Sequence, residues 1–193
     1  FDIVKKKLSD ISSVPIGISK DELEVIRYNF TENIGTLITS NKLQNIRYFI
    51  MSLIYEFRQI PNTNIIYIDG RNKTPEMKNL VKNYYNKEFD NLTESLLKYY
   101  ENINKTETKR NEILIISGIE KYVNSLTNKQ VFENIVKEMK KNENCKIIIL
   151  DDVAKVKSIA FELWFTTAFS NADGIWIGRG IAEQTIFKLS YSK

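Results

Sequence analysis

Four short apolar runs, separated by stretches with helical spacing, constrain the fold of this chain more than any other feature. The runs are Gly35–Thr39, Asn64–Ile68, Ile113–Ile116 and Lys146–Leu150. They lack the polar alternation of a strand with one solvated face, as expected when both faces of a parallel sheet are covered. Alternation of such strands with helices is typical of α/β proteins. We therefore expect one α/β domain with a mostly parallel central sheet and helices on both faces.

The segments between these runs have the periodicity of amphipathic helices. From Gln44 onward, apolar residues recur at i, i+3 and i+4 over roughly three to four turns, and Pro61 follows as a stop signal. Further helices are predicted over Pro75–Tyr85, Phe89–Ile103, Phe132–Met139 and Val153 to about Asn171.

The two ends of the chain are predicted to add a helix and four short strands. Residues 1–13 have helical spacing and are predicted to form a linker helix, whereas residues 14–193 form a single domain with no internal linker. The additional strands are predicted at Val14–Ser19, Glu24–Phe30, Gly174–Ile177 and Thr185–Leu189. The start at Phe1, with no methionine, suggests a fragment of a longer protein.

Composition excludes several kinds of chemistry. Histidine is absent from the 193 residues, which removes Ser-His-Asp and Cys-His catalysis and any His/Cys metal cluster. The single cysteine, Cys145, cannot form an internal disulfide. The net charge is +4, but the lysines are spread along the chain, and the runs at Lys5–Lys7 and Lys140–Lys141 lie on predicted solvated helix faces, so we expect no nucleic-acid partner. No apolar run is long enough to span a bilayer.

The segment between the Gly35–Thr39 strand and its helix is where a nucleotide-binding protein has its phosphate loop. The expected string is GxxxxGK[ST], in which glycines present backbone amides, lysine neutralises phosphate and Ser or Thr holds magnesium. Here no glycine occurs, Lys42 precedes the helix, and no Ser or Thr follows at the magnesium position. The sequence therefore argues against tight Mg-ATP binding. The residues left as candidates for a degenerate nucleotide site are Ser40, Asn41, Lys42, Gln44 and Asn45.

A magnesium site also needs a carboxylate at the end of a later buried strand. The Ile113–Ile116 run is followed by Ser117 and Gly118, and Glu120 is displaced by three residues. The Lys146–Leu150 run ends in Asp151 and Asp152, which is the better match on pattern. Aspartate before a helix is also a common N-cap, and we favour that role for Asp152.

The order of these segments resembles FtsK/SpoIIIE-type ATPase domains, in which two short strands precede the phosphate-loop strand. The segments that carry the resemblance are Val14–Ile18, Glu24–Phe30, Gly35–Thr39, Ile66–Gly70, Ile113–Glu120 and Lys146–Asp152. The closing segment Ala172–Gly180, followed by Gln184, is most similar to the C-terminal domains of the type VII secretion coupling ATPase, the EssC/EccC family.

This resemblance implies a P-loop NTPase-like sheet of the RecA/FtsK type. Ser117, Gly118 and Glu120 fall where the family has its magnesium carboxylate, in degenerate form. The resemblance implies no catalytic residue here and no metal, in a domain retained for architecture and recognition. The implied partners are other domains of the same ATPase and secreted helical proteins. The implied location is the cytoplasmic part of a membrane-anchored protein.

The end of the chain has two features with alternative interpretations. Arg179, between Gly178 and Gly180, could act as an arginine finger on a neighbouring subunit's phosphate, but Gly-x-Gly is first a turn signal and we favour a turn. The aromatic residues Trp164, Phe165, Phe169 and Trp176 are expected to belong mostly to the core, and any exposed part is a candidate for docking a client helix.

Three functional hypotheses follow. The first is a nonhydrolytic interaction domain of a secretion coupling ATPase, without a cofactor. The alternative is an active FtsK-like motor that translocates protein or DNA, binds ATP and Mg, and uses Lys42 and Asp151. The third is a DNA translocase domain that contacts the phosphate backbone and whose binding weakens steeply with salt.

Overall fold

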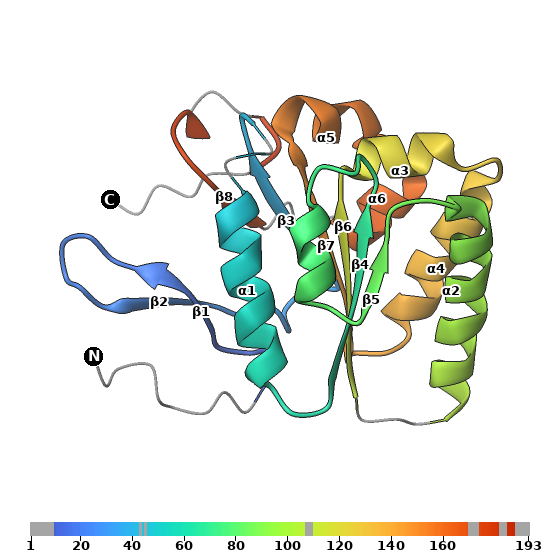
Figure 1. Cartoon of the computed structure of the whole chain (residues 1–193), viewed down its shortest axis with the longest axis horizontal. Helices are drawn as coiled ribbons and strands as arrows, with labels where there is room; N and C mark the ends of the chain where they lie inside the picture. Colours follow the sequence, from blue (N-terminus) through green and yellow to red (C-terminus); the bar gives the residue numbers. More distant parts are fainter. Residues whose placement is uncertain are drawn as a thin grey trace.

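The central sheet has six strands, all parallel, in the order β5-β4-β6-β7-β3-β8. A computed structural model describes residues 10–42, 44, 46–106, 110–169, 174–181 and 185–187. The strands are β3 (Gly35–Ser40), β4 (Thr63–Asp69), β5 (Asn83–Tyr85), β6 (Asn111–Ser117), β7 (Cys145–Asp152) and β8 (Gly174–Trp176). Figure 1 shows helices on both faces of this sheet, so the predicted fold class is confirmed.

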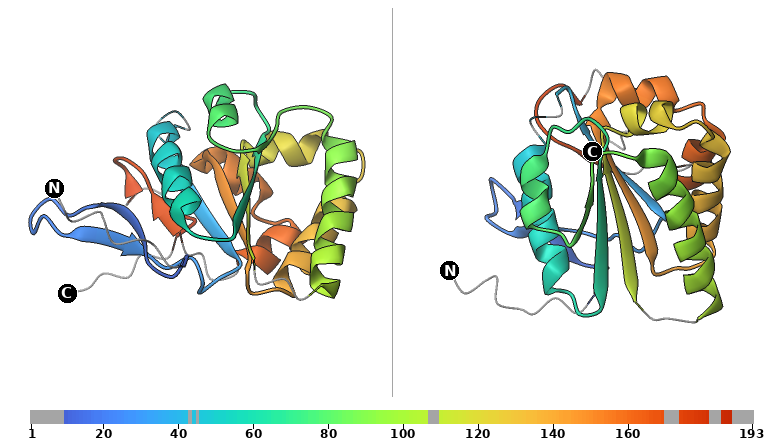
Figure 2. Two further views of the ribbon diagram at one scale, coloured as in Figure 1. Left: turned by 60° about the horizontal axis from the view of Figure 1, so that its bottom comes forward. Right: turned by 45° about the vertical axis from the view of Figure 1, so that its right-hand side comes forward.

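The helices divide between the two faces. One face is covered by α1 (Arg47–Gln59) and the 3₁₀ helix η3 (Pro75–Asn79). The other face is covered by α2, α4 and α6, with α3 and α5 beside the carboxyl ends of the strands (Figures 1 and 2). These helices are α2 (Phe89–Lys105), α3 (Ile119–Ser125), α4 (Lys129–Lys140), α5 (Val153–Ile159) and α6 (Leu163–Ala168).

Alternate residues of each central strand belong to separate cores. In β7, Ile147 and Ile149 pack on the side of α2 and α4, while Ile148 and Leu150 pack on the side of α1. Successive side chains of a strand point to opposite faces. Because both faces are covered, each strand needs an unbroken apolar run. Burial of these runs, at about 25 cal/mol per Å², holds the sheet together.

Two predicted helices differ from the structure. The segment Pro75–Tyr85 forms the short η3 and then β5, which pairs with β4. Tyr84 stacks on Tyr67 with ring centroids 5.9 Å apart, and aromatic residues favour a pleated, half-buried surface. The long helix predicted from Val153 is split into α5 and α6, because Glu162 has an extended conformation.

The predicted end segments fall partly outside the described residues. Residues 1–9 of the expected N-terminal helix are not described, and residues 10–13 form bends and a turn. Of the strand expected at Thr185–Leu189, the described residues 185–187 form bends instead. Within the described ranges, no helix is long and apolar enough to cross a membrane.

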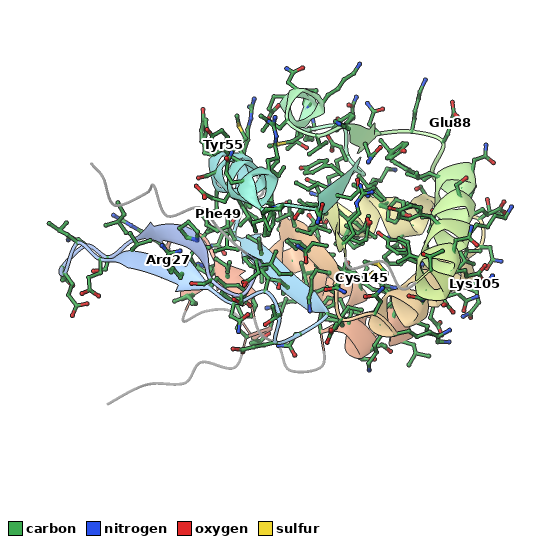
Figure 3. All side chains as sticks on the ribbon, turned by 90° about the horizontal axis from the view of Figure 1, so that it is seen from below. Arg27, Phe49, Tyr55, Glu88, Lys105 and Cys145 are labelled. Atoms are coloured by element: carbon green, nitrogen blue, oxygen red, sulfur yellow. The ribbon has the colours of Figure 1, made fainter. Side chains whose placement is uncertain are left out.

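A hairpin projects from the α/β body. It consists of β1 (Val14–Ile18) and β2 (Val25–Tyr28), both of which the sequence predicts as strands, and the two pair antiparallel. Figure 2 shows that it extends away from the sheet on the side of α1. Arg27 on this hairpin lies well apart from Glu88 and Lys105, which mark the two ends of α2 on the opposite side (Figure 3).

Candidate functional site at the carboxyl ends of the strands

The sheet register brings most of the sequence-predicted site residues to one edge. Thr39 pairs with Asp151, and Ser40 pairs with Asp152, across the parallel β3–β7 ladder. Strand β6, with Ser117 at its end, lies on the other side of β7. In open parallel sheets, ligands bind outside the carboxyl ends of the strands. This edge is therefore the candidate site.

The loop after β3 is closed by its own side chains. Ser40 Oγ accepts a hydrogen bond from the Lys42 amide at 3.0 Å and donates to the Lys42 carbonyl at 2.5 Å. Asn41 Nδ2 donates to the Arg179 carbonyl at 3.2 Å. A phosphate loop directs its amides at a ligand, whereas here the Lys42 amide is bonded within the loop. Asn45 lies outside the described residues.

Arg71 dominates the centre of this edge, and the sequence analysis did not identify it. It follows β4, and its guanidinium crosses the end of β6 to reach β7. Nη2 lies 2.8 Å from Asp151 Oδ1 and 3.6 Å from Glu120 Oε2, and Nη1 donates to Asp152 Oδ2 at 3.3 Å. One side chain thus joins the ends of three strands. A Gly-Arg pair directly after a buried strand was the available sequence signal.

Two glycines make room for this crossing. A Cβ atom on Gly118 would lie 2.7 Å from Arg71 Cγ, and Gly118 has a φ of +70°. A Cβ atom on Gly70 would lie 2.6 Å from the Gly118 carbonyl oxygen. The Gly70 amide donates to Ser117 and the Gly118 amide donates to Leu150, each at 2.8 Å. Glycine permits both the close approach and the left-handed conformation.

Asp151 is fully buried beneath Arg71. Its carboxylate accepts hydrogen bonds from the backbone amides of Asp152 at 2.8 Å and Glu120 at 3.3 Å. Burial raises the pKa of Asp151 to about 6, against the opposing effects of Arg71 and the two amides. The group is therefore mostly ionised at neutral pH and takes up a proton in mild acid.

Asp152 has the backbone position of an N-cap of α5, as predicted, but its side chain makes no capping hydrogen bond. Its carboxylate instead accepts from Arg71. Asp69, at the end of β4, is also buried and accepts from the Thr74 amide and hydroxyl and from Tyr84. Within the described part of the chain, no group of three or more acidic or thiol side chains is placed to hold a metal ion.

A cavity of about 420 Å³ lies beside Arg71, and we call it the crest cavity. Its lining residues are Lys42, Gln44, Arg47, Arg71, Lys73, Thr74 and Asp152. Four of the seven carry positive charge and one carries negative charge. Arg47 pairs with Glu76, outside this lining. Lys42 and Gln44 were expected at such a site, whereas Arg47, Arg71 and Lys73 were not.

Comparison with known proteins bears on the fold. No family model and no curated protein sequence matches this chain. Among solved structures, 93% of the chain aligns with the cytoplasmic domain of the type VII secretion ATPase EccC from Thermomonospora curvata, at a TM-score of 0.70 and 11% identity. The cytoplasmic domain of EssC aligns over 98% of the chain, at a TM-score of 0.69 and 14% identity.

The chain has the fold of the EccC and EssC ATPase domains. The resemblance found in the sequence is therefore confirmed at the level of the fold. The chain covers 23% of that EccC structure and 40% of that EssC structure. A third structure contains ATPases 2 and 3 of T. curvata EccC in complex with a signal sequence peptide, and aligns with 86% of the chain at a TM-score of 0.67 and 12% identity.

The Gly178–Gly180 segment has the geometry of a turn. Gly178 and Gly180 have φ values of +100° and +89°, which glycine adopts readily. The Arg179 carbonyl accepts from Asn41 and from Trp176 Nε1, so the turn is tied to the loop after β3. The Arg179 side chain is exposed, and its role as an arginine finger stays a hypothesis.

The aromatic segment before this turn is largely core. Trp164, Phe165 and Phe169 are buried, as expected. The exposed apolar residues here are Phe161, at 77%, and Leu163, at 59%, which flank the break between α5 and α6. The sequence analysis did not single out either residue.

Proposed function

We propose that this domain is a non-hydrolysing, ATPase-like part of a type VII secretion coupling protein, and that it acts in export by recognising secreted proteins or neighbouring domains. The observation that carries the proposal is the position of Arg71. Its guanidinium contacts Asp151, Asp152 and Glu120, the carboxylates nearest to where magnesium would be held. Arg71 therefore already balances part of the negative charge of these carboxylates.

The loop after β3 supports the same conclusion. Phosphoryl transfer depends on positioning and on electrostatic stabilisation by backbone amides, lysine and magnesium. Here no glycine opens the loop, and Ser40, the nearest hydroxyl, is bonded to the backbone of Lys42. Loss of these features removes catalysis while leaving the buried core intact.

Recognition of proteins is supported by the relatives and by the surface. A domain pair of the same fold binds a signal sequence peptide in T. curvata EccC. Phe161 and Leu163 present apolar surface between α5 and α6. An amphipathic helix of a secreted protein could bury its apolar face against these two side chains. A parent protein anchored in the membrane would hold this domain on the cytoplasmic side.

Calorimetric titration with Mg-ATP tests the absence of a working nucleotide site, and a pull-down with candidate secreted helical proteins tests recognition. We expect weak or no heat from Mg-ATP and specific retention of a secreted protein. Replacement of Phe161 and Leu163 by serine should reduce that retention. Micromolar Mg-ATP affinity with turnover would contradict the proposal.

The second candidate function is an active motor. It is favoured by the position of Lys42 in the lining of the crest cavity. In that case Lys42→Ala combined with Asp151→Asn would abolish hydrolysis. The absence of any hydrolysis in the wild type would remove this candidate.

A further inference from the structure

Among its described lining residues, the crest cavity combines four cations with a single carboxylate. All seven lining residues are polar or charged. Charge and hydrogen bonding are therefore available to recognise a ligand here. The only carboxylate in the lining, Asp152, already accepts from Arg71.

The four cations of the lining differ in how far they are neutralised. Arg71 is paired with Asp151 and Asp152, and Arg47 is paired with Glu76. Lys42 and Lys73 are exposed, and neither ammonium has a hydrogen-bond or ion-pair partner among the described residues. Their charges are the ones left to act on a ligand. Glu120 and Asp151 also lie near this edge, but they contact Arg71 and not the cavity.

We propose that the crest cavity binds a compact oxyanion, either a phosphate group or paired carboxylates, without a metal ion. This inference rests on the proposed function, because it takes the loss of the magnesium site as its starting point. In an active site, a divalent cation would place positive charge next to the carboxylates. Here Arg71 places positive charge at that position. A cation entering there meets a guanidinium, whereas an anion meets the two lysines.

The hydrogen-bond donors around the crest cavity come from two loops. Lys42, Gln44 and Arg47 come from the segment after β3, and Lys73 comes from the loop after β4, so the donors converge from two loops. Donors on long side chains tolerate variation in the ligand better than a rigid cradle of amides does. The open, solvated position of both lysines predicts binding that weakens with added salt.

The test uses the full chain and two probes, inorganic pyrophosphate and a short oligoglutamate peptide, titrated by calorimetry at low salt. Each titration is run with EDTA and again with Mg²⁺. We expect at least one probe to bind in EDTA, and Mg²⁺ to give no gain in affinity, since Mg²⁺ itself complexes pyrophosphate and lowers the concentration of the free anion. The probe that binds more tightly identifies phosphate or carboxylate as the source of the anion.

The variant Lys42→Gln/Lys73→Gln should weaken that binding about tenfold or more. The matched control is Lys98→Gln/Lys140→Gln, which removes the same charge from exposed positions on α2 and α4 and should leave binding unchanged. Failure of both probes to bind, a requirement for Mg²⁺, or equal losses in the two variants would overturn the inference. Those outcomes leave the proposed function standing, since that function fails only if the protein turns over ATP or recognises no protein.

Discussion

Two buried carboxylates lie at opposite ends of the same sheet and are held in different ways. Glu112, at the amino end of β6, accepts from Asn64 at 2.7 Å and from Tyr99 at 2.9 Å, and it pairs with Arg110 at its margin. Asp151, at the carboxyl end of β7, has a guanidinium directly over it. Neutral hydrogen-bond donors are the main partners of Glu112. The main partner of Asp151 is the Arg71 guanidinium, which reaches it across the end of β6.

The comparison teaches that burial alone does not mark a functional carboxylate. Burial raises the pKa of both groups. The difference lies in where their partners come from. Tyr99 and Asn64 lie on elements that pack directly against β6, as in any satisfied core. Arg71 reaches over the end of β6 through a passage that two glycines keep open, at the edge where related folds place their chemistry.

Removal of Arg71 should give the largest effect. Arg71→Ala leaves the buried Asp151 without its charged partner, and loss of one member of a largely buried pair costs about 3 kcal/mol of unfolding free energy. Urea unfolding at neutral pH measures it. The double variant Arg71→Ala/Asp151→Asn should recover part of the loss. If Asp151→Asn changes the unfolding free energy equally in the wild type and in Arg71→Ala, the pair is not coupled.

The second-largest effect should be the contribution of Asp151 to the pH dependence of stability. The pKa of Asp151 is raised from 3.8 in the unfolded chain to about 6 in the folded protein, so the folded state holds the proton more tightly. Its contribution to stability is complete below the unfolded pKa and is lost as the pH rises through about 6.

Relative to Asp151→Asn, the wild type should therefore lose about 2 kcal/mol between roughly pH 4 and pH 7. Urea midpoints of both proteins across this range provide the measurement. A constant difference between them would refute the buried, proton-binding state of Asp151.

Substitution of Gly118 tests the passage under Arg71. Gly118→Ala meets Arg71 Cγ and forces alanine into a left-handed conformation, at a cost of about 1–2 kcal/mol. The matched control is Gly17→Ala in β1, where a Cβ atom would have nothing within 4 Å. Thermal unfolding of the two variants compares them directly, and similar melting temperatures would argue against a tight crossing.

Removal of the cation at the amino end should have the smallest effect. Arg110 is half-exposed, and Glu112 keeps its hydrogen bonds from Asn64 and Tyr99 in its absence. Arg110→Ala should therefore cost less than about 1 kcal/mol in urea unfolding. A loss as large as that of Arg71→Ala would erase the distinction between the two ends.

The central strands were predictable because each is marked by a short continuous segment of the sequence. A strand covered on both faces needs a continuous apolar run, and β3, β4, β6 and β7 each carry one. Strand β5 was missed because it has only three residues and is stabilised by pairing with β4 and by the Tyr67–Tyr84 stack. Neither of these contacts has a periodic signal in the sequence.

The candidate site was predictable only in part. Residues next to strand ends were found, since parallel strands place their carboxyl ends together. Arg71 was missed because its partner Asp152 lies 81 residues away, and the contact depends on the register of three strands. The positive lining of the cavity likewise arises from two separate loops.

Phosphate release from Mg-ATP is the most direct test of the claim that Arg71 replaces the metal in a site without hydrolysis. The full wild-type chain should release no more phosphate than the Lys42→Ala/Asp151→Asn variant, at any ATP concentration. Saturable release by the wild type that the double variant loses would contradict the claim, and would identify the domain as an active motor.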